Sequence, residues 1–180
     1  MIVRFAAPGD AAAVAAIYAP YVTDSFVSFE EQAPGEDEMR RRIESGGGLH
    51  PWLVAEDEAG IAGYASASAF RPRAAYRYAV ETSVYLDRER CGRGLGRMLY
   101  ARLLDLLERQ GFVQAIGAIS LPNEPSVRLH RALGFAEAGV YRDVGWKCGG
   151  WRSVGLWQRA LAPASSPPAE PKRVTEVWEG

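Results

Sequence analysis

The stretch Cys91-Gly92-Arg93-Gly94-Leu95-Gly96 joins two regular patterns and decides how the surrounding chain is organised. Before it, residues 80–86 form an apolar run typical of a strand, and after it residues 97–110 follow a helical period. A glycine-rich turn between a strand and a helix N-terminus favours anions, because the unpaired N–H groups of the first helical turn point outward. Glycine also permits positive φ and close approach to a phosphate. The same glycines suit a plain strand–helix connection, so the turn alone does not identify a function.

Length and composition predict a single globular domain. The 180 residues are 48% hydrophobic and 24% charged, which is ordinary for a chain with one hydrophobic core. A net charge of −1 lacks the basic excess of nucleic-acid-binding proteins, so no nucleic-acid partner is expected. No stretch approaches the ~20 apolar residues of a membrane span, so no membrane partner is expected either. The two cysteines and two histidines form neither a disulfide framework nor a metal pattern, which predicts a cytoplasmic protein without a metal.

The hydrophobic pattern predicts a mixed α/β sheet flanked by helices. Strands are expected at residues 2–5, 25–29, 52–56, 61–67, 80–86, 112–119, 136–141 and 153–161, and helices at 10–22, 36–45, 97–110 and 122–133. Strands before residue 80 connect through hairpins and those after it alternate with helices, which favours a mixed sheet. We expect one domain over residues 1–161 and a Pro-rich tail over 162–180, whose residues 174–178 are able to dock onto the body.

A second motif runs from Asn123 to Phe135. Asn123, Ser126 and His130 are spaced by three and four residues, so they share one face of a short helix. That helix starts just past a strand end, where ligands bind in open α/β sheets. The glycine turn followed by this motif resembles the GNAT superfamily of acetyl-CoA-dependent N-acetyltransferases. The family carries Arg/Gln-x-x-Gly-x-Gly/Ala in its phosphate loop and, further on, Asn, a small residue, Tyr or His, and Gly-Phe.

Further motifs resemble one branch of that superfamily. They are Phe70-Arg71-Pro72-Arg73, Tyr76, Glu81-Thr82-Ser83-Val84-Tyr85, Leu121-Pro122-Asn123 and the tryptophan-containing stretch 149–158. The branch comprises acetyltransferases of phosphinothricin, methionine sulfone and methionine sulfoximine. The resemblance spans roughly residues 2–161. It implies a GNAT fold, direct acetyl transfer from acetyl-CoA to an amine, and a homodimer.

The resemblance implies a cofactor site along the strand and the glycine turn. The pantetheine arm would lie along Val84, Tyr85 and Leu86, with Asn123 and Ser126 bonding the pantetheine or phosphate region. The pyrophosphate would be bound by Cys91, Gly92, Arg93, Gly94, Leu95, Gly96 and Arg97. Cys91 stands where the family carries Arg or Gln, so Arg93 or Arg97 would have to supply the side-chain charge. A cysteine at a helix N-terminus can have a lowered pKa and unusual reactivity, the alternative being a bystander thiol.

Two residues are candidates for proton transfer. Glu81 is the candidate base, because the acceptor amine must lose a proton; an ordinary carboxylate is weak for this, so we expect burial or a water relay. Pairing of Glu81 with Arg71 or Arg73 is the alternative. His130 stands where many relatives carry a Tyr acid, and its ordinary pKa near 6.5 suits either direction of proton transfer. A purely structural histidine is the alternative.

The acceptor side is predicted from a basic loop. Arg71, Arg73 and Tyr76 precede Glu81, and paired guanidiniums suit a carboxylate, phosphinate or sulfone oxygen. Phe29 is expected to form an apolar wall. A solvated basic loop is the alternative. The sequence thus favours N-acetylation of a small amino-acid-like molecule, with a detoxifying or herbicide-resistance role. A protein N-acetyltransferase is disfavoured by the basic loop, and a non-catalytic CoA-binding module remains open because of Cys91.

Overall fold

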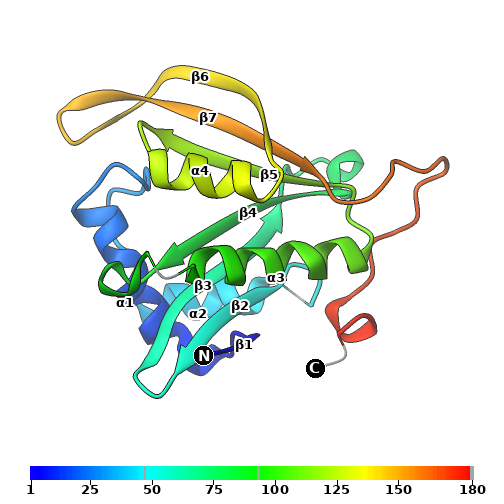
Figure 1. The fold of residues 1–180 in the computed structure, drawn as a ribbon, viewed down its shortest axis with the longest axis horizontal. Helices are drawn as coiled ribbons and strands as arrows, with labels where there is room; N and C mark the ends of the chain where they lie inside the picture. Colours follow the sequence, from blue (N-terminus) through cyan, green and yellow to red (C-terminus); the bar gives the residue numbers. More distant parts are fainter. Residues whose placement is uncertain (47, 93, 179–180) are drawn as a thin grey trace.

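The sheet is mixed, and its spatial order departs from chain order at one end. The computed structural model describes residues 1–46, 48–92 and 94–178. Within them, seven strands form one sheet in the order β1-β2-β3-β4-β5-β7-β6 (Figure 1). The strands are β1 (Ile2–Phe5), β2 (Trp52–Asp57), β3 (Gly60–Ala69), β4 (Ala79–Leu86), β5 (Gln114–Leu121), β6 (Ala136–Lys147) and β7 (Gly150–Ala160). Strands β4 and β5 run parallel and the other neighbours antiparallel, which confirms the predicted mixed sheet.

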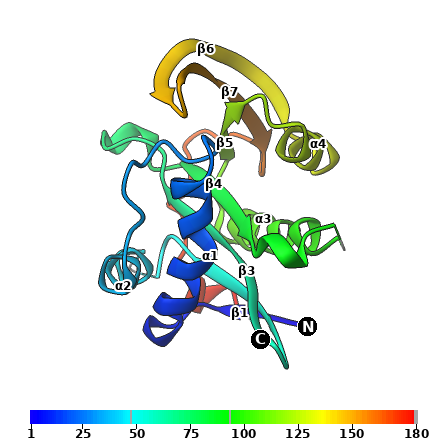
Figure 2. The ribbon, with the colours of Figure 1, turned by 90° about the vertical axis from the view of Figure 1, so that its left-hand side faces the viewer.

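Helices cover both faces of the sheet. They are α1 (Ala11–Thr23), α2 (Glu36–Ser45), α3 (Leu95–Gln110) and α4 (Glu124–Ala132). Figure 2 shows α1 and α2 on one side of the sheet and α3 and α4 on the other. The leucines predicted to share one face of α3 are all buried: Leu95, Leu99, Leu103 and Leu106. Burying each contributes about 1.5–3 kcal/mol, so packing of this face holds α3 on the sheet.

The sheet splits into two halves in its middle. Pairing between β4 and β5 covers three positions, from Ala79 opposite Gln114 to Glu81 opposite Ile116. Beyond them β4 continues along β3 as far as Leu86, while β5 follows β7 as far as Leu121. The two strands therefore diverge after Glu81 (Figure 1). A cleft opens between them, and it points toward the glycine turn.

Some predicted element bounds were wrong. Residues 25–29 are not a strand; they fold back on the end of α1, where Ser25 Oγ donates to the Tyr21 carbonyl at 2.8 Å. The strand predicted from residue 112 begins at Gln114, because the Phe112 N–H donates to the Leu107 carbonyl at 3.1 Å and so still belongs to the end of α3. Strands β6 and β7 are longer than predicted and meet at a two-residue turn. Its residues, Cys148 and Gly149, have φ of 52° and 69°, as in a type I′ hairpin.

The C-terminal tail returns to the body, as predicted for residues 174–178. The Val174 N–H donates to the Gly48 carbonyl at 2.8 Å, and Trp178 lies 4.5 Å from the ring of Phe5. Residues 162–171 contain no helix or strand and run exposed along the surface. Across the described ranges, none of the helices combines the length and the apolar character that a membrane span requires.

Candidate active site

The cleft between β4 and β5 is a small pocket of about 50 Å³. It is lined by Val27, Thr82, Ser83, Val84, Tyr85, Ala118, Ile119, Ser120, Asn123, Ser126 and His130. Three groups of predicted site residues meet here: the part of β4 expected to bind the pantetheine arm, the first turn of α4, and His130. Sequence reasoning missed Val27 and Ser120, because neither belongs to a recognisable motif and both reach the cleft through folding.

Strand β4 presents unpaired backbone to this cleft. The Asp87 N–H donates to Ala62 on β3 at 2.9 Å, so alternation along the strand directs the backbone groups of Val84 and Leu86 to the opposite side. The register with β5 ends at Glu81, which leaves Val84 without a strand partner there. The Leu86 carbonyl accepts a hydrogen bond from the Tyr21 hydroxyl at 2.7 Å. An extended ligand can therefore add to this edge as a strand would.

The glycine turn ends in an uncapped helix. Gly92 and Gly94 have φ of 85° and 76°, and Gly94 is the N-cap of α3. The first helical bond runs from Met98 N–H to the Gly94 carbonyl, so the amides of the preceding turn lack intrahelical acceptors. That turn has no acidic residue and no side-chain cap, which leaves its amides and the helix dipole available to an anion. Arg93 lies outside the described residues, and Arg97 is exposed in the first turn.

Gly96 allows α3 to sit close to the cleft. A Cβ at this position would lie 3.3 Å from Leu86 Cδ1 and 3.7 Å from Leu129 Cδ2. A Cβ would require the Leu86 side chain to move by a few tenths of an ångström, so glycine permits this close approach of α3 to β4.

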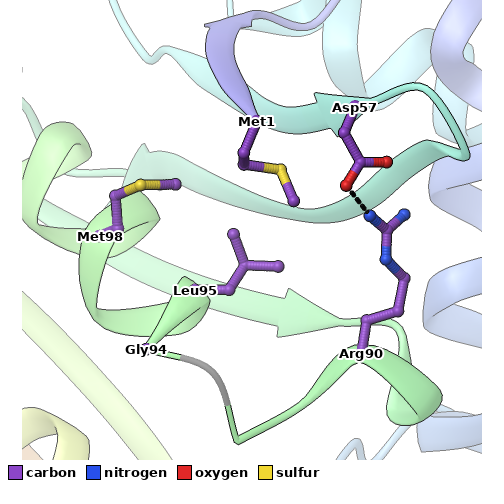
Figure 3. Close-up of a pocket in the computed structure, with 6 residues that line it drawn as sticks. All are labelled: Met1, Asp57, Arg90, Gly94, Leu95 and Met98. Atoms are coloured by element: carbon purple, nitrogen blue, oxygen red, sulfur yellow. Dashed lines mark hydrogen bonds and ion pairs between the residues drawn. The ribbon is translucent and has the colours of Figure 1, made fainter.

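A second pocket of about 270 Å³ lies on the other side of the turn (Figure 3). It is lined by Met1, Asp57, Arg90, Gly94, Leu95 and Met98, and shares no residue with the cleft. Figure 3 shows Arg90 reaching across it to Asp57, and Arg90 also donates to the Gly60 carbonyl at 3.2 Å. The Arg90 guanidinium lowers the pKa of Asp57. These bonds tie the start of the glycine turn to the β2–β3 hairpin.

Cys91 does not have the lowered pKa that its position suggested. Burial raises the pKa of its thiol; the Tyr21 hydroxyl partly offsets this, and the charges of Asp87 and Arg88 have smaller, opposite effects. The physical reason is placement: the N-cap of α3 is Gly94, so Cys91 lies three residues outside the helix. Its Sγ is 3.3 Å from the Asp87 carbonyl oxygen. A raised pKa favours the bystander alternative over an activated thiol.

Glu81 is the last paired residue before the strands diverge. Val80 and Thr82 are buried toward α3, so Glu81 faces the α1–α2 side, opposite Ser68 on β3. Burial raises the pKa of Glu81, and the charge of Arg71 partly offsets this. Within the described chain its carboxylate has no hydrogen bond or ion pair, so the alternative of a salt bridge to Arg71 or Arg73 is not formed. Glu81 does not line the cleft, but it lies next to Thr82 and Ser83, which do, at the point where the strands separate. A half-buried carboxylate without a salt bridge at this place suits a base.

His130 is only 4% exposed and both its ring nitrogens have partners. Nδ1 lies 2.9 Å from the Ser126 carbonyl oxygen, and Nε2 lies 3.2 Å from the Tyr100 hydroxyl. A carbonyl only accepts, so Nδ1 carries the proton and Nε2 accepts from Tyr100. Burial lowers the pKa of His130, which keeps the ring neutral. This geometry favours the structural alternative. Tyr100, which completes the arrangement, carried no signal in the sequence beyond its place on α3.

Asn123 and Ser126 open α4 at the edge of the cleft. The Asn123 Oδ1 accepts from the Ser126 N–H at 3.2 Å, so Asn123 caps the helix as expected. Both residues line the cleft as well. Among the described residues, no three or more His, Cys, Asp or Glu side chains cluster so as to hold a metal ion.

None of the predicted acceptor residues lines the cleft, and Tyr76 lines a separate pocket beside Tyr78 and Gln114. Arg71 lies over the ring of Phe70 at 4.7 Å, and the Tyr76 ring is 5.6 Å from the same ring. Arg71, Arg73 and Tyr76 are exposed. Phe29 is 38% exposed and its ring packs against Gly145 on β6. The structure thus brings Arg71 close enough to influence Glu81 electrostatically, while Phe29 lies near Val27, which lines the cleft.

Comparisons with known proteins agree with this geometry. The family described as "Acetyltransferase (GNAT) domain" matches residues 3–152. The chain is 42% identical over 179 residues to a phosphinothricin N-acetyltransferase of Streptomyces viridochromogenes, covering 97% of this chain and 95% of that one. It is 34% identical over 170 residues to an L-methionine sulfoximine/L-methionine sulfone acetyltransferase of Salmonella typhimurium, covering 94% and 99%. The crystal structure of a GNAT superfamily phosphinothricin acetyltransferase from Sinorhizobium meliloti in complex with AcCoA matches with a TM-score of 0.88 at 38% identity, over 94% and 93%.

Proposed function

The chain belongs to the GNAT acetyltransferase family, and we propose that it acetylates the amino group of a small amino-acid-like acceptor by direct transfer from acetyl-CoA. The acceptors favoured are phosphinothricin, methionine sulfoximine and methionine sulfone. Relatives named for these compounds match almost the whole chain at 34–42% identity. The observation that carries the proposal is the split between β4 and β5, which begins at an unpaired carboxylate and runs toward a glycine turn.

The cleft and the turn fit acetyl-CoA. The edge of β4 around Val84 offers backbone groups to an extended pantetheine arm, and the first-turn amides of α3 offer donors to a pyrophosphate. Leu86 contributes the wall against which Gly96 packs, and Tyr85 and Ser126 line the cleft. A backbone N–H of the 84–86 segment stabilises the negative charge that develops on the thioester oxygen.

Glu81 acts as the base through water. Its raised pKa makes it a stronger base than an ordinary carboxylate, and the charge of Arg71 favours its ionised form. The carboxylate receives the amine proton through water as the C–N bond forms and the C–S bond breaks. The thiolate takes its proton from solvent. We assign neutral His130 to the wall of the cleft, where it fixes Tyr100 and the start of α4.

We further propose a homodimer joined at the β6–β7 hairpin. Trp146 and Trp151 are each 62% exposed, and their rings lie 5.5 Å apart on one face of this hairpin. Tyr141 and Val144 on β6 are also about half exposed. Aromatic surface of this kind is typical of interfaces. Sedimentation should give a dimer for the natural chain and a monomer for Trp146→Asp; a monomeric natural chain would refute this part.

The biological setting that we propose is detoxification in the cytoplasm. Both cysteines are free, which suits a reducing compartment. Acetylation removes the positive charge of an amino-acid analogue and so blocks recognition as an amino acid, which is the chemical basis of herbicide resistance.

The test is thiol release from acetyl-CoA with a panel of acceptors. The panel contains phosphinothricin, methionine sulfoximine, methionine sulfone, glutamate, ordinary amino acids and a lysine peptide. Turnover on the first three, and much less on the others, supports the proposal. Turnover on the peptide alone indicates a protein acetyltransferase, and acetyl-CoA binding without any turnover indicates a non-catalytic module; either result rejects it.

A further inference from the structure

The side chain of Lys147 is enclosed by backbone carbonyls. Its Nζ lies 2.7 Å from the Val22 oxygen and 2.7 Å from the Ser28 oxygen, and it also donates to the Glu30 carbonyl. An ammonium has three N–H donors, so the three carbonyls use all of them. These carbonyls belong to the end of α1 and to the segment after it, whereas Lys147 ends β6. The bonds join parts of the chain more than 100 residues apart.

The segment held by Lys147 reaches across the split sheet. Residues 24–35 connect α1 and α2, and they contain no regular helix or strand. Both helices pack on the β4 half of the sheet, but the segment contacts the other half. Ser120 on β5 donates to the Val27 carbonyl at 3.1 Å, and Arg152 on β7 lies over the Phe26 ring at 4.1 Å. It therefore bridges the two halves on the side opposite α3.

The 24–35 segment contains Val27, which lines the cleft, and Phe29, the predicted apolar wall of the acceptor site. Val27 lines the cleft, and two residues later the Phe29 ring packs against Gly145. Gly145 lies two positions before Lys147, so both face the segment from the same side of β6. A side chain at Gly145 would overlap the Phe29 ring. The position of Phe29 therefore depends on two residues of β6: Gly145 leaves room for the ring, and Lys147 binds the segment that carries it.

A second charged group, Arg42, holds the 24–35 segment at Glu30. Arg42 on α2 donates to both carboxylate oxygens of Glu30, at 2.8 and 3.0 Å, and the Tyr18 hydroxyl donates to one of them at 2.9 Å. The Glu30 side chain is thus held by α1 and α2, while its carbonyl is held by Lys147. Glu30 therefore connects the near half of the sheet to the β6–β7 hairpin.

We propose that Lys147 is a positioning residue that holds the 24–35 segment across the cleft and sets the acceptor wall at Val27 and Phe29. This rests on the proposed function, since the segment borders the cleft where the acceptor amine would meet Glu81. A compact ammonium suits this place, because it directs three donors at three carbonyls, whereas a guanidinium is a planar fork. Removing the ammonium leaves three carbonyls without a donor and loosens the segment, but it leaves the glycine turn of the cofactor site unchanged.

The experiment compares Lys147→Met with Lys172→Met, which removes an exposed lysine that has no side-chain partner in the described chain. Lys147→Met should raise KM for the acceptor about tenfold or more, since small displacements of a positioning wall have large effects. KM for acetyl-CoA should rise by a clearly smaller factor, because Lys147 contacts neither β4 nor the glycine turn and the segment touches the cofactor cleft only through Val27. Amide exchange of residues 24–34 should become faster. Lys172→Met should change none of these, and Lys147→Arg should be intermediate.

Three outcomes would overturn the proposal. The first is unchanged amide exchange in residues 24–34, and the second is faster amide exchange with an unchanged KM for the acceptor. The third is a parallel rise of both KM values together with a lower Tm, which indicates a merely structural role. If Lys147→Met does not fold, Lys147→Arg is judged by the same criteria. If the unmodified enzyme acetylates no member of the acceptor panel, the proposed function is refuted instead. The two failures can be told apart, because amide exchange of residues 24–34 is measured without turnover.

Discussion

Gly117 on β5 and the imidazole of His130 on α4 are so close that a Cβ at Gly117 would lie 2.6 Å from Nε2 and 2.8 Å from Cδ2. The absence of a side chain at Gly117 thus lets the His130 ring pack against β5 and reach the Tyr100 hydroxyl. This contact fixes α4, and with it Asn123 and Ser126, at the edge of the cleft.

Gly117→Ala should lower the free energy of unfolding by about 1–3 kcal/mol, because the ring has no room to retreat. Acetyl-CoA affinity should fall as well, since α4 carries cleft residues. Gly9→Ala is the control, because a Cβ there meets nothing within 4 Å. Urea unfolding followed by fluorescence measures the stability and calorimetric titration the affinity. Equal stability of the two variants would contradict the packing described.

Glu81→Gln should lower kcat by about 10²-fold or more, as expected for loss of a general base. The fold should be unaffected, because the described residues make no hydrogen bond to this carboxylate. The natural enzyme should lose activity as pH falls through the raised pKa of Glu81, since the base must be ionised. The variant should lack that limb of the pH profile. Glu137→Gln, on an exposed position of β6, is the control, and an unchanged pH profile in Glu81→Gln would reject the assignment.

Gly94→Ala should weaken acetyl-CoA binding, whereas Gly111→Ala should not. The two glycines cap opposite ends of α3 with φ of 76° and 90°, and a Cβ at either meets nothing within 4 Å. Both changes impose a similar backbone strain of about 1–2 kcal/mol. Only Gly94 lies in the turn proposed to bind pyrophosphate. Calorimetric titration with acetyl-CoA separates them, and equal affinities would move the phosphate site elsewhere.

Cys91→Ser should retain activity within about twofold, because burial and Asp87 raise the pKa of the thiol and leave little thiolate near neutral pH. Iodoacetamide should react with Cys91 no faster than with an ordinary exposed thiol. The rate should increase as pH rises toward the raised pKa. Mass spectrometry of the alkylated protein gives the rate, and rapid labelling at neutral pH would show that the thiol is activated after all.

Trp178→Ala should destabilise the protein by about 1–3 kcal/mol, because the ring packs on Phe5 and also lies 4.7 Å from the Arg102 guanidinium. Activity of the folded variant should be unchanged, since this contact lies at the end of the sheet remote from the cleft. Thermal unfolding and turnover at room temperature measure the two effects. A loss of kcat without a loss of Tm would instead connect the tail to the active site.

The sequence by itself determined the elements and their order. Glycine stops, the leucine period of α3 and the turn between β2 and β3 are local signals, so they predicted a mixed sheet and the position of the glycine turn. The family motifs predicted Glu81 as the base and the segment that would bind the cofactor, and both stay predictions. Local signals failed at residues 25–29, whose β-like composition is overridden by bonds to α1, β5 and β6.

Only the tertiary structure decided where those residues meet. The divergence of β4 from β5 after Glu81 depends on how the two halves pack, which no local pattern records. The burial of His130 against Gly117, the ordinary character of the Cys91 thiol and the enclosure of Lys147 also depend on distant partners. Their physical basis is desolvation and hydrogen bonding across large sequence separations. These contacts form only when the chain has folded, so the periodicity and the motif spacing of the sequence do not predict them.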